Sequence, residues 1–332
     1  MAKQPNVLLF GAGSIGAVYL HQLRQAGCTI TAVCRSNYSA VKDDGFRLQS
    51  KRFGDVRYKP DSLIRSTAEC PPDCFYDYIL VATKSLPGSK LSAMDMIRPA
   101  VGNHTETAIV LCQNGIGIED EAAKAFPHNP ILSGVIYLPA TQTSQGIIHH
   151  PEMLDLLELG TFPANAPASH KTAAVRFADL MVKGGGDVKV YDDIQVARWS
   201  KLILNASWNP ICALTLCTDG DFLLSSSPFA HDLVWGLMME IVALARTIGI
   251  PGVDEKTAEE KLMIAQRRAS SGTGREMSML QDIRQGRLFE VEAIIGNAVR
   301  LGQKWGVEMP RLQTVYALAK GRYEGLLKET QI

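Results

Sequence analysis

Three polar residues recur every four positions in the second half of the chain, where they could act together on a ligand. Lys201, Asn205 and Asn209 lie along a helix that the sequence pattern predicts from Ile194 to about Trp208, so their side chains share one face. Apolar residues flank this stripe, which makes it costly unless it meets a partner or water. One ammonium and two amides could hold a carbonyl oxygen, a hydroxyl and a carboxylate. The spacing fits an exposed polar helix face equally well.

A hydroxyl and a carboxylate bracket a segment nearer the C-terminus. Ser278 and Glu290 are its ends, and a helix predicted over Gly286–Trp305 puts Glu290 near its N-terminal end. A carboxylate is favourable there simply because it meets the positive end of the helix dipole. Taken alone, this segment predicts no chemistry.

A glycine-rich turn near the start of the chain has the context of a dinucleotide-binding fingerprint. It follows a predicted strand, Asn6–Phe10, and opens a predicted helix, Ser14–Gln25. The first glycine permits the tight turn, the second lets the backbone approach a pyrophosphate, and the third lets helix and strand pack closely. Amides at the helix N-terminus then face the phosphate charge. The expected cofactor-binding residues of this turn are Gly11, Gly13, Ser14, Ile15 and Gly16.

The end of the next predicted strand, Thr29–Cys34, indicates which nicotinamide cofactor is used. An acidic residue there would bind the ribose 2′-hydroxyl of NAD(H), and none is present. Arg35 and the hydroxyl of Ser36 instead offer a cation and a donor suited to a 2′-phosphate. The sequence therefore favours NADP(H), although Arg35 could also be an ordinary surface arginine.

Two further residues follow predicted strands of the first half. Lys84 comes after Tyr76–Ala82, and Asn114 comes after Thr107–Cys112. Ligands bind beyond the carboxyl ends of strands in open α/β sheets, so both residues are placed to reach a cofactor or substrate. Turn chemistry alone could also explain an asparagine followed by glycine.

The positioning elements fall into two groups that predict two domains. Residues 1–190 alternate short apolar strands with helical patterns, which is typical of a Rossmann-type α/β domain with a parallel sheet, and Arg47–Lys59 predicts a hairpin. Residues 191–332 are mainly helical and would form a substrate-binding and catalytic domain. Beyond the first helix of this part, the predicted helices are Phe229–Ile248, Asp254–Arg268, Gly286–Trp305 and Pro310–Glu329.

Composition narrows the function classes. Lys plus Arg and Asp plus Glu are both 34, and this zero net charge argues against a broad grip on nucleic acid or an anionic membrane, leaving a small molecule as partner. No apolar run approaches the roughly 20 residues of a membrane span. Seven cysteines without zinc-ligand spacing predict reduced thiols and no metal site. We therefore expect a cytoplasmic protein.

These motifs together resemble the ketopantoate reductase family from the glycine turn to about residue 325. The resemblance rests on Gly11–Gly16, on Cys112–Gly117, on Lys201–Asn205 with Asn209-Pro210, and on Ser278–Asp282 followed by Glu290. It implies reduction of 2-dehydropantoate by NADPH to D-pantoate, a step of pantothenate biosynthesis.

The family's residue roles follow from the matching positions. The resemblance implies that Lys201 is the general acid and that Glu290 positions substrate beside it. It further implies that substrate is bound by Asn205, Asn209 and Ser278, and that Asn114 and Lys84 lie near the nicotinamide.

One departure puts the identity of the 2-oxo acid in doubt. Where the family often has an Asn-x-Ser-Ser pattern ending at the position of Ser278, this chain has Arg275 and Met277. Two alternatives to a ketopantoate reductase proper therefore stay open. One is a paralogue that reduces another 2-oxo acid or ketone, and the other is a non-catalytic NADPH-binding sensor, against which the retained Lys201 and Glu290 weigh. The long apolar helices Phe229–Ile248 and Gly286–Trp305 could form the face of a homodimer.

Overall fold

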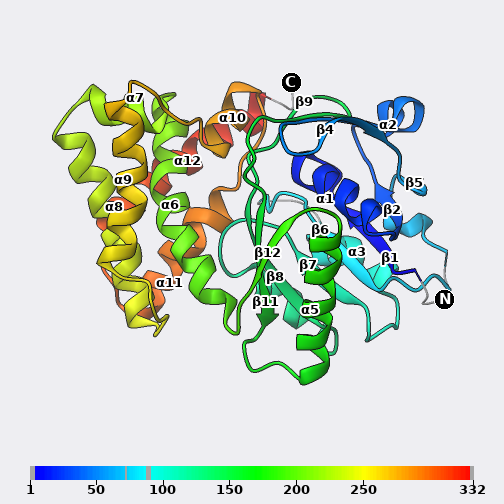
Figure 1. Cartoon of the computed structure of the whole chain (residues 1–332). Coiled ribbons are helices and arrows are strands. Elements are labelled where there is room, and N and C mark those ends of the chain that lie inside the picture. The colour runs from blue at the N-terminus through cyan, green and yellow to red at the C-terminus, as the bar shows by residue number, and fades with distance from the viewer. Residues whose placement is uncertain (1–3, 72, 87–90, 330–332) are drawn as a thin grey trace. The chain divides into compact units, whose positions relative to one another are not determined.

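The structure, a computed structural model, describes residues 4–71, 73–86 and 91–329, and within them the chain forms two compact units (Figure 1). The α/β unit comprises described residues 4–71, 73–84, 91–113 and 118–194. The helical unit comprises described residues 85–86, 114–117 and 195–329. The predicted fold class, a Rossmann-type α/β domain followed by a mainly helical one, is confirmed.

Eight strands of the described residues form the central sheet of the α/β unit, in the order β12-β11-β8-β7-β6-β1-β2-β5. All neighbouring strands are parallel except β8 and β11. Central strands such as β1 are continuous apolar runs because helices cover both faces of a parallel sheet. The strands are β1 (Asn6–Phe10), β2 (Thr29–Val33), β5 (Ser62–Ile64), β6 (Tyr78–Val81), β7 (Ala108–Leu111), β8 (Ile131–Tyr137), β11 (Leu156–Phe162) and β12 (Asp187–Val190).

The strand order reverses at β1, which lies between β2 and β6. Ligands of open α/β sheets bind beyond the carboxyl ends of the strands at such a switch point. Helix α1 contacts α5, and α3 contacts α4. The helical segments of this unit are α1 (Ser14–Gln25), α2 (Tyr38–Asp44), η1 (Thr67–Glu69), α3 (Ala93–Val101), α4 (Ile118–Ala125) and α5 (Ala168–Lys183).

A second sheet in the α/β unit has the order β4-β3-β10-β9 and contacts α1. Its strands are β3 (Phe46–Ser50), β4 (Gly54–Tyr58), β9 (Thr141–Ser144) and β10 (Ile147–His150). The predicted hairpin over Arg47–Lys59 is confirmed as β3 and β4, with Gly54 at φ 80° where the return strand begins.

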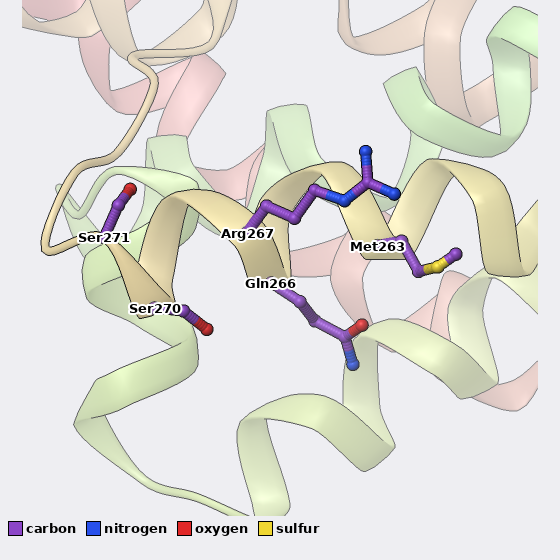
Figure 2. A pocket seen from close by; sticks show the side chains of 5 residues that line it. All are labelled: Met263, Gln266, Arg267, Ser270 and Ser271. Atoms are coloured by element: carbon purple, nitrogen blue, oxygen red, sulfur yellow. The ribbon is translucent and has the colours of Figure 1, made fainter.

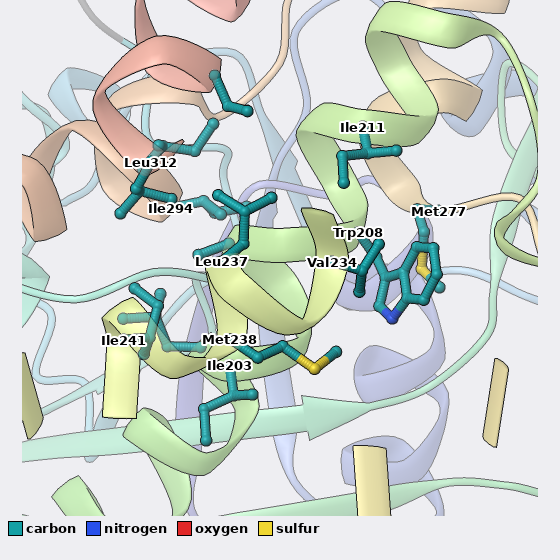
Figure 3. Close-up of a cluster of buried hydrophobic side chains, with 14 of the residues drawn as sticks. Ile203, Trp208, Ile211, Val234, Leu237, Met238, Ile241, Met277, Ile294 and Leu312 are labelled. Atoms are coloured by element: carbon teal, nitrogen blue, oxygen red, sulfur yellow. The ribbon is translucent and has the colours of Figure 1, made fainter. Parts of the chain in front are cut away.

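The helical unit packs around one apolar core, part of which is shown in Figure 3. Its elements are α6 (Ile194–Thr215), α7 (Asp219–Ser225), α8 (Phe229–Thr247), α9 (Glu255–Ser270), α10 (Ser278–Arg284), the π-helix η2 (Glu292–Gly296), α11 (Asn297–Trp305) and α12 (Pro310–Glu329). Within the described residues, no helix combines the length and the apolar character that a membrane span requires.

Two predicted helix boundaries in this unit are wrong. Helix α6 does not stop near Trp208 but continues through Pro210 to Thr215. Burial of Trp208, Ile211 and Cys212 offsets the hydrogen bond that the proline cannot donate.

The helix predicted from Gly286 begins instead at Val291. Gly286, at φ 61°, ends α10, and the amide of Arg287 bonds back to the carbonyl of Asp282. A left-handed glycine with this return bond is a common helix C-terminus.

Candidate active site

The glycine turn lies at the switch point of the central sheet. Gly11 has φ 104°, and a Cβ there would lie 2.5 Å from the amide nitrogen of Thr83, which follows β6. A Cβ on Gly16 would lie 2.2 Å from the Gly11 carbonyl oxygen. At Gly13, by contrast, an added Cβ would meet no atom within 4 Å. The outer glycines are thus required by packing, while the middle one faces open space that a phosphate group could occupy.

The backbone of this turn leads directly into α1. Gly13 is the N-cap residue and supplies no capping side chain, and Ser14 and Ile15 are half-buried in the first turn. An uncapped helix N-terminus presents amides that suit a phosphate.

The loop after β2 is fastened to the glycine turn within the α/β unit. The buried side-chain amide of Asn37 donates a hydrogen bond of 2.8 Å to the Ala12 carbonyl oxygen. Arg35 and Ser36 are exposed on this loop, and within the described residues no carboxylate forms an ion pair with Arg35. Sequence reasoning missed Asn37, because only the folded loop shows which carbonyl its amide reaches.

Lys84 follows β6 and is exposed at the end of its stretch of the α/β unit. Asn114 follows β7 in sequence but belongs to the helical unit, as does Ser85. Lys84 and Asn114, which follow neighbouring strands, thus belong to different units.

Lys201, Asn114 and Glu290 are joined in the helical unit. The Lys201 Nζ donates to Asn114 Oδ1 at 3.0 Å, and Asn114 Nδ2 donates to Glu290 Oε2 at 3.1 Å. The other carboxylate oxygen of Glu290, Oε1, accepts the Ser85 backbone N–H at 3.1 Å. Glu290 is buried and Lys201 is half-buried. A single amide thus links a cation to a buried carboxylate.

The backbone next to Asn114 is held by two side chains. The buried Arg198, three residues before Lys201 on α6, donates to the Gly115 carbonyl oxygen at 2.8 Å. Asn297 of α11 donates to the Ile116 carbonyl oxygen at 2.6 Å. Neither residue was expected from the sequence, since both act on the backbone of a segment far away in the chain.

The π-helix η2, which follows Glu290, also fixes the backbone next to Asn114. The backbone N–H of Asn297 donates to the Glu292 carbonyl oxygen, five residues back. In a regular α-helix it would donate to the Ala293 carbonyl oxygen, four residues back. The Ala293 carbonyl accepts the Ile116 amide at 3.0 Å instead. A Cβ on Gly115, where φ is 90°, would lie 2.1 Å from this Ala293 oxygen. The approach of the two backbones therefore requires glycine.

The two asparagines farther along α6 have different surroundings. The Asn209 Oδ1 accepts the Ser278 hydroxyl at 2.9 Å and the Met279 amide at 3.1 Å, so Asn209 holds the start of α10. The side chain of Asn205 is buried, and the part of the chain that the structure describes offers it no hydrogen-bond partner. Such an amide can both donate a hydrogen bond to a ligand and accept one from it.

The segment before Ser278 is fixed by Asp219, a fully buried carboxylate at the start of α7. Asp219 accepts the Arg275 amide at 2.6 Å and pairs with Arg268 at 2.5 Å. Met277 is buried in the apolar core. The Arg275 guanidinium is half-buried, and within the described residues it forms no ion pair. Arg275 is thus anchored by its backbone, and no carboxylate of the described residues pairs with its guanidinium.

A separate shallow pocket lies on α9 and contains none of the expected site residues (Figure 2). Met263, Gln266, Arg267, Ser270 and Ser271 line it. Among the described residues, no three His, Cys, Asp or Glu side chains gather as a metal site would require.

Family models match both parts of the chain. The model described as ketopantoate reductase PanE/ApbA matches residues 7–164, and the model of its C-terminal part matches residues 193–324. A 2-dehydropantoate 2-reductase of Nostoc sp. is 27% identical over an alignment of 315 residues, and the match covers 93% of this chain and 92% of that protein.

Solved structures agree with these matches. The crystal structure of 2-dehydropantoate 2-reductase from Methylococcus capsulatus is 33% identical, covers 97% of both chains and has a TM-score of 0.82. A ternary structure of D-mandelate dehydrogenase with NADH and anilino(oxo)acetate shares the fold at 22% identity, with a TM-score of 0.82 over 97% of this chain and 99% of that one. The chain therefore belongs to the ketopantoate reductase family, a family of oxidoreductases.

Proposed function

We propose that the protein reduces 2-dehydropantoate to D-pantoate with NADPH, in the biosynthesis of pantothenate, and that Lys201 is the general acid. The observation that carries this proposal is the chain of hydrogen bonds from Lys201 through Asn114 to Glu290. These hydrogen bonds orient the Lys201 ammonium and fix Asn114 and Glu290 beside it. Proton delivery to a carbonyl oxygen requires such positioning. The names of the relatives support the choice of substrate.

The residues of the glycine turn fit a dinucleotide. The open space at Gly13 and the uncapped N-terminus of α1 would hold the pyrophosphate, and the exposed Arg35 with Ser36 would hold a 2′-phosphate. When bound, NADPH supplies the hydride that adds to the carbonyl carbon of the substrate. We propose that residues 1–190 bind this cofactor, with Lys84 and Asn114 toward its nicotinamide end.

The proposed mechanism needs one proton from the protein. An unperturbed lysine is protonated near neutral pH, and the Nζ–H bond of Lys201 breaks as the proton passes to the carbonyl oxygen. The ammonium charge also stabilises the alkoxide that develops on that oxygen. Glu290 keeps Asn114 oriented through the amide nitrogen, so that the amide oxygen faces Lys201. Asn205, Asn209 and Ser278 would bind the hydroxyl and carboxylate of the substrate.

A second candidate is reduction of another 2-oxo acid or ketone with the same acid and cofactor. The half-buried Arg275, which has no ion pair within the described residues, favours it, because a guanidinium can bind a second anionic group.

Loss of NADPH absorbance would test these candidates, with purified protein, 2-dehydropantoate and a panel of other 2-oxo acids, each also run with NADH. Fast and selective turnover of 2-dehydropantoate is expected. Selective turnover of another member of the panel would replace the proposal by the second candidate. Tight NADPH binding without any turnover would indicate a sensor.

A further inference from the structure

A second arginine, Arg65, follows strand β5, the neighbour of the strand β2 that precedes Arg35. Strands β2 and β5 are parallel neighbours in which Val33 pairs with Ile64, and the Cys34 amide extends the pairing with a bond of 2.9 Å to the Ile64 carbonyl. Arg65 directly follows Ile64, so Arg35 and Arg65 leave the same edge of the sheet on adjacent strands. Neighbouring strands lie about 4.8 Å apart, well within the reach of two arginine side chains.

The Arg65 side chain is folded over toward the loop that carries Arg35. Its guanidinium carbon lies 3.9 Å from the centroid of the Tyr38 ring, a close cation–π contact. Tyr38 belongs to the same turn as Arg35, because its amide donates to the Arg35 carbonyl oxygen at 3.2 Å. The aromatic ring therefore restricts Arg65 before any ligand arrives, which lowers the entropic cost of binding.

Local carboxylates do not neutralise this pair of cations. The two acids nearest to Arg65 in sequence, Asp61 and Glu69, accept backbone amides. Asp61 Oδ2 accepts that of Ile30, and Glu69 Oε1 accepts those of Arg65 and Ser66. Within the described residues, neither Arg35 nor Arg65 forms an ion pair with a carboxylate. Two guanidinium groups on adjacent strand ends repel each other unless an anion lies between them.

The position of the pair relative to the glycine turn is fixed within the α/β unit. The Asn37 amide ties the Arg35 loop to Ala12, and Ala12 lies between the first two glycines of the turn. A ligand with phosphates at the glycine turn and another phosphate at the ends of β2 and β5 has the layout of NADP(H).

We propose that Arg65, held by Tyr38, is a second ligand of the cofactor's 2′-phosphate, which lies between Arg35 and Arg65. This inference rests on the proposed use of NADP(H) and adds a recognition residue to that site. A phosphate monoester presents enough acceptor oxygens for two guanidinium forks, each forming charge-assisted hydrogen bonds.

Calorimetric titration with adenosine 2′,5′-bisphosphate and with 5′-AMP tests the proposal without turnover. We expect Arg65→Gln to weaken binding of the bisphosphate about tenfold, as the loss of a hydrogen bond between charged groups would, and to change binding of 5′-AMP less than twofold. Arg65→Lys keeps the charge but loses the fork and should fall between Arg65→Gln and the parent protein. Arg35→Gln should show the same selectivity for the bisphosphate.

The control is Arg176→Gln, which removes an exposed arginine of α5, a helix that contacts β8, β11 and β12 at the other end of the sheet. It should leave both titrations unchanged. Equal losses for the two nucleotides in Arg65→Gln, or no loss for either, would overturn the role of Arg65. A parent protein that binds the bisphosphate no better than 5′-AMP would overturn the use of NADP(H) itself, and the two failures are thereby distinguished.

Discussion

At the scale of the residue, the charges of Lys201 and Glu290 determine which way the side-chain amide of Asn114 is oriented. Its oxygen faces the Lys201 ammonium and its nitrogen faces the Glu290 carboxylate. The reversed amide would set its NH2 group against the ammonium and its oxygen against the carboxylate, which are two repulsive contacts. Lys201 and Glu290 thus act on each other through Asn114.

Substitutions of Lys201 distinguish two roles of this side chain, donation of a proton and stabilisation of negative charge. We expect Lys201→Ala to lower kcat by roughly 10²- to 10⁴-fold, the usual contribution of a general acid, and to leave the Kd for NADPH nearly unchanged. Lys201→Arg keeps a cation but holds its proton too tightly to donate it, so it should restore little. Steady-state kinetics with calorimetric binding of NADPH would check both variants. If Lys201→Arg regained most of the turnover, charge stabilisation and not proton transfer would be the role of Lys201.

At the scale of the element, the π-helix η2 changes which carbonyl each amide reaches. The Ala293 carbonyl accepts the amide of Ile116, and Gly115 makes this approach possible. A local irregularity of one helix thereby fixes the segment that carries Asn114.

Gly115→Ala should disturb this segment selectively. The new methyl group would lie 2.1 Å from the Ala293 oxygen, so the segment must shift, and a displacement of about 1 Å can cost roughly 100-fold in rate. NADPH binding should change far less than kcat, because the glycine turn belongs to the α/β unit. Gly249→Ala is the matched control, because Gly249 also has a positive φ, 82°, but an added Cβ there would meet no atom within 4 Å. Both variants incur the cost of a left-handed alanine, about 1–2 kcal/mol, visible in Tm. Equal kcat values for the two variants would contradict the positioning role of this segment.

The sequence predicted those elements whose signal is local. The glycine turn, β1, α1 and the hairpin over Arg47–Lys59 each have their pattern within one short stretch, and the structure contains all of them. The face shared by Lys201, Asn205 and Asn209 follows from helical periodicity alone. By contrast, Arg198 and Asn297 hold backbone groups 83 and 181 residues away, and no local pattern announces such bonds. The π-helix was missed for the same reason, since the Ala293 carbonyl accepts the distant Ile116 amide.

At the scale of the whole molecule, stability is expected to depend on pH through a buried acid of the α/β unit. Asp155 is 1% exposed and accepts a hydrogen bond from the Gln22 side chain. Burial raises its pKa from 3.8 to about 6, against the opposing effects of Arg52 and Gln22. A raised pKa means that the folded state favours the protonated carboxyl. The contribution of Asp155 to the free energy of unfolding is therefore highest below pH 3.8. It falls as the pH rises through 6 and stays low above that pH.

Asp155→Asn should remove this dependence, because the amide is neutral at every pH. We expect it to raise the free energy of unfolding at pH 8 by about 3 kcal/mol, and by far less near pH 4, since two pKa units correspond to that energy. Urea unfolding of both proteins from pH 4 to pH 8 would measure the difference. The pKa of Asp187 shifts in the opposite direction, because its hydrogen bond with Arg52 lowers it. Asp187→Asn should therefore destabilise the protein at pH 8 and have less effect as the pH falls through the lowered pKa. If Asp155→Asn were no more stabilising at pH 8 than at pH 4, the pKa of Asp155 would not be raised in the folded protein.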